Sequence, residues 1–419
     1  MSEPGAPDGD DRENRSLTAS LRVRNYRLYA VGQTVSVLGT WMQNIAIAWY
    51  TLEISQNGAI LGLVTAIRWL PVLVLGPWAG LVADRSDKQR MFLVTQTALA
   101  VISVGVAILS VTGNLPLGGL VVAVLAVGIV GAFDTPSRQA LISELVPAAL
   151  LTNAVGLNSA TTNIAKLAGP GLAGVVIAAF GVTPCFVINA ISFLAVILSL
   201  LRMGRSELFR ALPAHRGKGQ IRAGLGYVMR SAELRPTMLM VLATGIFTAE
   251  FPVTVPLMTT TTFDSAADGY GTAMAVMGVG AVAGGIIVAH QRRPSVRSIA
   301  VSAIQWGAVI IVAALAPTFA VLLISLALVG VGTVTFNSAA KTLLQLRSDP
   351  AFRGRVMSLW AIAWQGGTVV GAPLVGFVGS WLGPRYGMLI GAVTALAVGL
   401  LALLPRHRDA DPGERGDPA

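Results

Sequence analysis

Three ionisable residues stand inside long apolar stretches of this 419-residue sequence: Arg68, Lys166 and Glu250. A charge in the middle of a membrane is costly, so such residues usually pair with one another or have a functional role. A carboxyl group removed from water favours its protonated form, which allows it to exchange protons. Glu250 is therefore the candidate for proton coupling, and Pro252 and Pro256 could open the helix beside it. A static ion pair with Arg68 or Lys166 is the structural alternative.

Two apolar stretches carry polar residues at helical spacing. Residues three and four apart share one helix face, which then lines water or a ligand, or forms hydrogen bonds between helices. We expect both faces to line a substrate cavity, with hydrogen bonding between helices as the alternative. The first comprises Gln33, Ser36, Thr40, Gln43 and Asn44, and the second Asn158, Ser159, Thr162, Asn163 and Lys166.

Trp364 and Gln365 are further candidates for contact with the ligand. The two cations Arg68 and Lys166 outnumber the single acid Glu250, so this cavity would carry a net positive charge. It would therefore favour an anionic or carboxylate-bearing compound. Catalytic residues and metal ligands are not expected, because the three histidines fall in predicted loops or the tail and no apolar stretch contains a histidine-based pair. A phosphate-binding Gly-Lys-Ser/Thr loop is also missing from the sequence, so we expect no cofactor and a proton gradient as the energy source.

The stretches that hold these residues are long enough to cross a membrane. The chain is 54% hydrophobic and 12% charged, against about 25% charged in a typical soluble domain. A spanning helix needs about 20 mostly apolar residues, and lipid offers no partner for unpaired backbone groups. We predict an all-α membrane protein with twelve transmembrane helices at residues 27–50, 59–83, 91–112, 115–134, 152–180, 184–201, 237–262, 269–290, 297–316, 318–340, 356–381 and 386–404.

The basic residues are distributed on one side of this membrane. All Lys and Arg residues except Arg68, Lys166 and Arg385 fall in the tails or in every second loop. Cytoplasmic loops carry such an excess, so both termini are expected in the cytoplasm, with the chain crossing the inner (cytoplasmic) membrane of a bacterium many times. The net charge of +10 then indicates contact with anionic membrane lipids rather than nucleic acid.

A long basic connection divides the twelve predicted helices into two sets of six. Phe133-Asp134 followed by Arg138 recurs in the second set as Phe336-Asn337 followed by Lys341. Paired halves with a site between them are the plan of many transporters. We predict a tail over 1–26, six-helix bundles over 27–201 and 237–404, a linker over 202–236 and a second tail over 405–419.

The loop after the second predicted helix reads from Gly80 through Asp84-Arg85 to Arg90, and this pattern resembles a motif of the major facilitator superfamily. The resemblance implies a conformational latch in which Asp84 braces the start of the eleventh helix. It also implies that Asp134 pairs with Arg85 or Arg90. The sequence departs from the family pattern after Ser86, where Asp87 replaces the expected glycine.

The fifth predicted helix resembles the antiporter motif of the same superfamily, a series of glycines that ends in Gly-Pro. Its positions here are Gly156, Gly169, Pro170 and Gly174, with alanine at two expected glycines. Small residues at these spacings allow close helix contact, which is the alternative reading. Over residues 20–405 the chain resembles the branch that contains the enterobactin exporter and macrolide efflux proteins, on segments such as Leu38-Gly39-Thr40-Trp41-Met42.

These resemblances imply a secondary active transporter, not an enzyme. We expect a monomer that exports a small amphipathic molecule, such as a siderophore or a drug, by proton-coupled alternating access. An importer of the same fold would share nearly every feature. A polytopic membrane enzyme or lipid-handling protein is the remaining alternative, and it should show a nucleophile with its base or a set of metal ligands near a membrane face.

Overall fold

The computed structural model describes residues 18–209, 220–290 and 294–404. Residues 1–17 of the first predicted tail, the whole second tail over 405–419, residues 210–219 of the linker and residues 291–293 lie outside the described residues. Within them the chain forms helices and no strands. The elements of the first half are η1 (Ala19–Arg22), α2 (Arg24–Ser55), α3 (Gly58–Arg85), α4 (Lys88–Val111), α5 (Leu117–Leu145), η2 (Ala148–Leu150), α6 (Leu151–Phe180), α7 (Thr183–Arg202) and η3 (Arg205–Glu207).

The second half begins with the linker helix α8 and ends with α16 at the carboxyl end of the described chain. Its elements are α8 (Gln220–Arg230), α9 (Leu234–Phe247), α10 (Phe251–Leu257), η4 (Met258–Thr262), α11 (Ala267–His290), α12 (Val296–Ala314), α13 (Phe319–Arg347), α14 (Pro350–Ala361), η5 (Ile362–Gly366), α15 (Thr368–Trp381) and α16 (Pro384–Leu403).

Eleven helical segments among the described residues are long and apolar enough to cross a membrane. They agree with eleven of the twelve predicted spans. The exception is α2, the predicted first span, whose run of Gln, Ser, Thr and Asn side chains lowers its apolar character. The all-helical membrane architecture is confirmed, whereas the count of twelve stays a prediction for α2.

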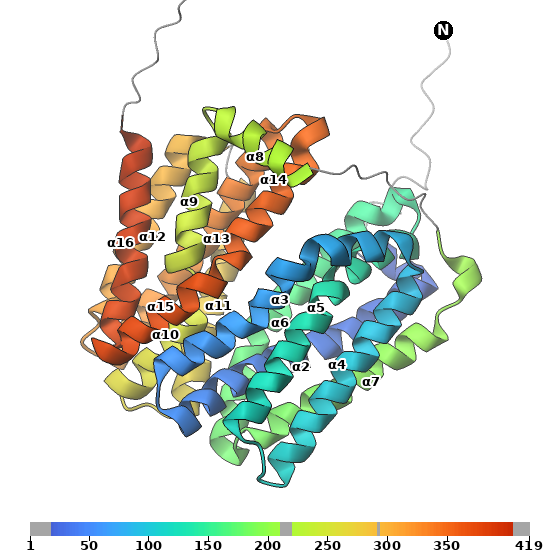
Figure 1. The fold of residues 1–419 in the computed structure, drawn as a ribbon, viewed down its shortest axis with the longest axis horizontal. Helices are drawn as coiled ribbons and strands as arrows, with labels where there is room; N and C mark the ends of the chain where they lie inside the picture. The colour runs from blue at the N-terminus through green and yellow to red at the C-terminus, as the bar shows by residue number, and fades with distance from the viewer. Residues whose placement is uncertain (1–17, 210–219, 291–293, 405–419) are drawn as a thin grey trace, which may run out of the picture.

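The two halves repeat one pattern of helix pairs. In the first half α3 packs on α5 and α4 packs on both α5 and α7. In the second half α11 packs on α13, and α12 packs on both α13 and α16. The two sets of helices lie side by side (Figure 1). This correspondence supports the duplicated plan that the Phe-Asp and Phe-Asn segments suggested.

The halves meet at the end of the molecule opposite the first and last described residues (Figure 1). There α3 lies on α15 and α6 lies on α11. A Cβ atom at Gly174 of α6 would lie only 2.6 Å from the Cα atom of Gly271 in α11. Backbones can approach this closely only where both residues lack side chains.

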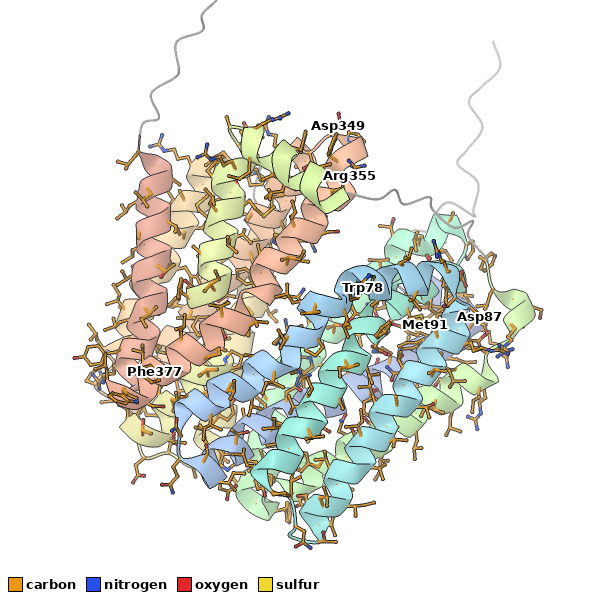
Figure 2. All side chains as sticks on the ribbon, in the orientation of Figure 1. Trp78, Asp87, Met91, Asp349, Arg355 and Phe377 are labelled. Atoms are coloured by element: carbon orange, nitrogen blue, oxygen red, sulfur yellow. The ribbon has the colours of Figure 1, made fainter. Side chains whose placement is uncertain are left out.

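At the other end the halves are apart. Trp78, on the last turns of α3, is 64% exposed and is labelled in Figure 2. Cβ atoms at Gly76 of α3, Gly156 of α6 and Gly285 of α11 would each meet no atom within 4 Å. The structure is therefore closed at one end of the interface and open at the end that carries the termini.

Two of the predicted continuous spans are interrupted. The span predicted at 237–262 breaks at Glu250, between α9 and α10, and continues into the π-helix η4. The span predicted at 356–381 contains a second π-helix, η5. The two interruptions are neighbours, because Gly245 of α9 lies against the backbone of Ala363 and Trp364. Interruptions of this kind often mark functional sites.

A buried amide ties the helices of the first half together. Asn189 of α7 donates to Oε1 of Gln43 at 2.5 Å and to Oγ of Ser103 at 3.2 Å. Its Oδ1 accepts from the hydroxyl of Thr40 at 3.4 Å. The side chain thus joins α2, α4 and α7 at a depth where water cannot replace a lost partner.

Replacing Gly174 with Leu should prevent closure of the interface at the Gly174–Gly271 contact, because the added side chain overlaps the α11 backbone. The population should shift away from the described conformation. A cysteine introduced at exposed Ser159, in a chain whose own Cys185 is buried, reports this shift. We expect a membrane-impermeant maleimide to label it about tenfold more slowly from the side of the termini.

Gly285→Leu is the matched control, since its side chain would enter open space on the same helix as Gly271. An unchanged labelling rate in Gly174→Leu would show that this contact does not set the conformation.

Replacing Asn189 with Ala should destabilise the first half, because Gln43 and Ser103 lose their buried partner. We expect a loss of about 1–2 kcal/mol, measured as a lower midpoint of thermal unfolding in detergent. Asn163→Ala, at an exposed position of α6, should leave the midpoint unchanged. Equal midpoints for the two variants would contradict this role for Asn189.

Candidate functional site

Glu250 is buried at the break between α9 and α10, with 1% of its surface exposed. Neither carboxylate oxygen has a hydrogen-bonding partner within the described chain, although the Thr368 hydroxyl is close enough to interact. A Cβ atom at Gly371 of α15 would lie 3.3 Å from its Oε1 atom. An unpaired carboxyl group of this kind is far less costly when it carries a proton.

Neither cation forms the expected alternative ion pair with Glu250. The guanidinium of Arg68, in α3, donates to Oδ1 of Asn44. The Nζ atom of Lys166, in α6, lies 5.3 Å from the ring centroid of Trp41. Within the described residues, both cations contact α2 rather than a carboxylate.

The polar face of α6 is accessible, whereas its role in lining a substrate cavity stays a prediction. Ser159, Asn163 and Lys166 are exposed, and Asn158 and Thr162 are half-buried. Asn158 also accepts a hydrogen bond from the hydroxyl of Tyr29 at 2.9 Å, so it contributes to packing as well. The exposed apolar residues Ile164 and Val175 lie about half a turn away from Lys166, on the face suited to lipid.

The polar stripe of α2 differs from the prediction. Gln33, Ser36 and Gln43 are buried, and Thr40 donates to Asn189, so these four residues do not line an accessible cavity. Gly32 and Gly39 bring α2 against Ser199 and Ser192 of α7, which covers this face. Inter-helix hydrogen bonding, the alternative reading, describes Thr40 and Gln43. Only Asn44 of the stripe reaches a cation of the site.

Trp364 and Gln365 lie within the π-helix η5, half-buried and exposed respectively. Trp364 stacks on Trp306 of α12 with ring centroids 6.4 Å apart. Gly366, next along the chain, lies against Leu73 of α3. Both predicted contact residues therefore occupy an irregular segment that faces the first half of the molecule.

The loop expected to form the latch is only partly described, because the side chain of Asp84 lies outside the described residues. Gly80 is half-buried, and Arg85 and Arg90 are exposed. Asp87, which departs from the family pattern, caps α4 by accepting from the backbone N–H of Arg90 at 2.8 Å. The preference of helix starts for aspartate explains this departure and could have predicted it.

Asp134 has other partners than the predicted arginines. It accepts from the hydroxyl of Thr95 at 2.8 Å and from Nε2 of Gln96 at 2.7 Å, both on α4. Arg138, one turn further along α5, interacts electrostatically with Asp134. Arg85 at the end of α3 and Arg90 at the start of α4 are exposed, and the predicted pair of Asp134 with either one is not formed in the described residues.

The antiporter-like motif divides into two parts. Gly169 lies against the Cβ atom of Trp41, and the carbonyl of Pro170 lies near Gly271. Together with Gly174, these positions pack α6 on its neighbours, which is the packing alternative. Gly156 makes no such contact in this conformation.

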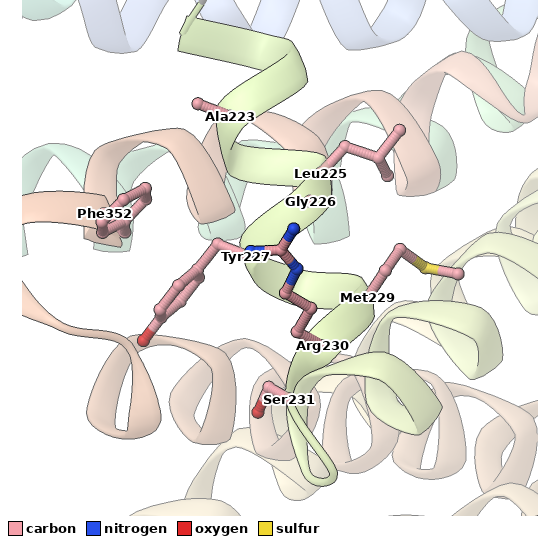
Figure 3. Close-up of a pocket in the computed structure, with 8 residues that line it drawn as sticks. All are labelled: Ala223, Leu225, Gly226, Tyr227, Met229, Arg230, Ser231 and Phe352. Atoms are coloured by element: carbon pink, nitrogen blue, oxygen red, sulfur yellow. The ribbon is translucent and has the colours of Figure 1, made fainter.

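The described residues enclose one small cavity at Arg68 and a larger one along α8. A cavity of about 10 Å³ is lined by Gln43 and Arg68, and it has room for at most one water molecule. A cavity of about 1130 Å³ lies along α8. There Tyr227 stacks on Phe352 with centroids 4.5 Å apart and accepts from the backbone N–H of Asp349 (Figure 3).

The described residues contain no cluster of three or more His, Cys, Asp or Glu side chains that could hold a metal ion. The candidate site residues described above comprise four kinds of group. They are a buried carboxyl, two cations, amides and aromatic rings.

Sequence comparison finds relatives with transport functions. The chain is 28% identical to the staphyloferrin A transporter of Staphylococcus aureus, over 58% of this chain and 62% of that protein. It is 25% identical to macrolide efflux protein A of Streptococcus pyogenes, over 43% and 44% of the two chains. It is 24% identical to the multidrug efflux pump Tap of Mycolicibacterium fortuitum, over 89% and 94%. The first two matches thus span less than two thirds of those relatives.

Solved structures of transporters share the fold. A bacterial homologue of the human lysosomal transporter Spinster, in an inward-facing and unoccupied conformation, aligns with a TM-score of 0.69 at 16% identity, over 91% of this chain and 97% of that one. A POT family transporter in complex with a thioalcohol-conjugated peptide aligns with a TM-score of 0.74 at 11% identity, over 91% and 95%.

A family model described as transmembrane secretion effector matches residues 15–414, nearly the whole chain. The relatives found are transporters rather than enzymes, and efflux proteins are prominent among them. Together with the all-helical fold of two related halves, this match means that the chain belongs to the transmembrane secretion effector family of major facilitator transporters.

Proposed function

We infer that this protein is a proton-coupled exporter of a small amphipathic molecule, such as a siderophore or a drug, and that Glu250 carries the proton. The observation that supports this function most directly is the buried carboxyl group of Glu250, for which the described residues offer no ion pair and, beyond the nearby Thr368 hydroxyl, no hydrogen-bonding partner. An ionisable side chain in this setting is costly to the fold, which favours a role in transport.

The position of Glu250 connects protonation to movement. It stands where α9 ends and α10 begins. The α10 segment contacts α2 and α3 of the first half, and Leu257 at its end lies against Gly58. A change in the charge of Glu250 would therefore act on the segment that closes the interface, which gives proton binding a route to alternating access.

Two kinds of observation support export as the direction of transport. They are the functions of the relatives and the distribution of charge along this chain. The matching family is described as a secretion effector, and two of the relatives named above are efflux proteins. The charge distribution of the loops places the termini in the cytoplasm of a bacterium, and on that orientation the open end of the interface faces the cytoplasm, where an exporter takes up its cargo.

The linker helix α8 provides a contact with membrane lipid. Its exposed apolar residues Leu225 and Met229 stand one turn apart, and Arg230 follows them. An amphipathic helix of this composition lies in the interface of an anionic membrane. The protein would act in the bacterial cytoplasmic membrane, as a monomer, without a bound cofactor.

Replacing Glu250 with Gln should uncouple transport from the proton gradient, because the amide cannot release a proton. In inverted membrane vesicles that generate an acidic interior, the native chain should accumulate radiolabelled staphyloferrin A or erythromycin. Accumulation should collapse with a protonophore. We expect Glu250→Gln to lower gradient-driven accumulation at least about tenfold, and Glu250→Asp to retain part of it.

Glu53→Gln removes an exposed carboxyl group at the end of α2 and serves as the control. Accumulation that still follows the proton gradient in Glu250→Gln would exclude Glu250 as the proton carrier.

A further inference from the structure

Arg68 and Lys166 approach the same turn of α2 from different helices. Arg68 of α3 contacts Asn44, and Lys166 of α6 contacts the ring of Trp41. Trp41 and Asn44 are three residues apart, so their side chains are neighbours on one helix face. The two cations are therefore brought together at one position on α2 by three separate elements.

Neither cation is neutralised within the described chain. Both lack an ion pair there, and Asn44 and Trp41 offer only a neutral carbonyl oxygen and a ring face. Two acids within the long helices have other surroundings, since Glu250 is buried at the α9–α10 break and Asp134 accepts hydrogen bonds from Thr95 and Gln96. Cations within membrane-spanning helices are costly, and they usually mark the pathway of a substrate or an ion.

The two cations differ in accessibility. Lys166 is exposed, and Arg68 and Asn44 are half-buried. Lys166 belongs to the polar face of α6, opposite the exposed apolar residues Ile164 and Val175. A ligand that reaches the accessible face of α6 therefore meets Lys166 and the ring of Trp41, and Arg68 contacts Asn44 on the same turn of α2.

We propose that Arg68 and Lys166, together with Asn44 and Trp41, bind a carboxylate group of the cargo. The guanidinium presents a planar fork that matches the two oxygens of a carboxylate, and the ammonium adds a second charge without fixed geometry. The indole ring of Trp41 supplies an apolar surface for the adjoining part of the molecule. The substrate class is thus an amphipathic carboxylate rather than a cationic drug, and this assignment rests on the proposed export function.

Equilibrium dialysis with the purified full-length protein tests this assignment without a proton gradient. The probes are staphyloferrin A, its methyl ester with the carboxylates masked, and erythromycin, which carries an amine. We expect the acid to bind at least about tenfold more tightly than the ester, because the charge-assisted hydrogen bonds are lost on esterification. This comparison uses the native chain, so it does not depend on whether a variant folds.

Single substitutions then show which residues produce the preference for the acid over the ester. Arg68→Gln and Lys166→Gln should each weaken binding of the acid about tenfold and leave binding of the ester unchanged. Lys166→Arg should retain most of the affinity. Arg297→Gln, which removes an exposed cation at the start of α12, should change neither.

Three outcomes would overturn the assignment. They are equal affinity for the acid and the ester, equal loss of both in Arg68→Gln and Lys166→Gln, or binding of erythromycin without binding of the acid. Failure of the proposed coupling would appear elsewhere, as gradient-driven transport that survives Glu250→Gln. A preference for the acid together with gradient-driven transport in Glu250→Gln would therefore keep the carboxylate site and reject the coupling role of Glu250.

Discussion

The close approach of backbones between the two halves is the interaction on which the rest of the structure depends. Gly174 on Gly271 and Gly62 on Ala372 replace side-chain packing with direct contact between helices. In lipid, helices gain little from hiding apolar surface, so such van der Waals contact determines which helices associate. Because these contacts occur at one end only, the other end opens and the polar face of α6 becomes accessible.

Some buried polar groups in this molecule stabilise the packing of helices, and others are candidates for coupling. The residue type alone does not tell these two roles apart. Asn189 has several partners and stabilises the contact of α2 with α7 and α4. Glu250 has none by normal hydrogen-bond geometry, although it is equally buried. A satisfied polar network specifies one arrangement of helices. An unsatisfied carboxyl group remains free to change its charge, which is why Glu250 is the better candidate for coupling.

The irregular segments lie where the halves must move. Glu250 marks the break before α10, and η5 carries Trp364 beside α3. A regular helix resists local change because each turn repeats its hydrogen bonds, whereas a break or a π-helix leaves some of them unmade. These segments can therefore act as hinges when the protein changes conformation, while the long helices keep their backbone hydrogen bonds.

The sequence by itself determined the class of the protein and most of its helices. Apolar runs longer than the membrane is thick permit little else, and the distribution of Lys and Arg predicts the orientation. It also identified Arg68, Lys166 and Glu250, since ionisable residues within such runs are rare. The Asp84-Arg85 loop and the Gly169-Pro170 segment indicated the family that the whole-chain match then showed.

Only the tertiary structure decided which polar residues face one another. The spacing of Gln33, Gln43 and Asn44 shows which face of the helix each residue occupies. It does not show whether that face packs on α7 or contacts Arg68, because helical periodicity contains no information about the neighbouring helix. The same limit made Arg85 or Arg90 the expected partner of Asp134, where Thr95 and Gln96 stand instead. Sequence spacing defines each helix surface, whereas the contacts of Arg68 and Lys166 with one turn of α2 depend on how three helices cross.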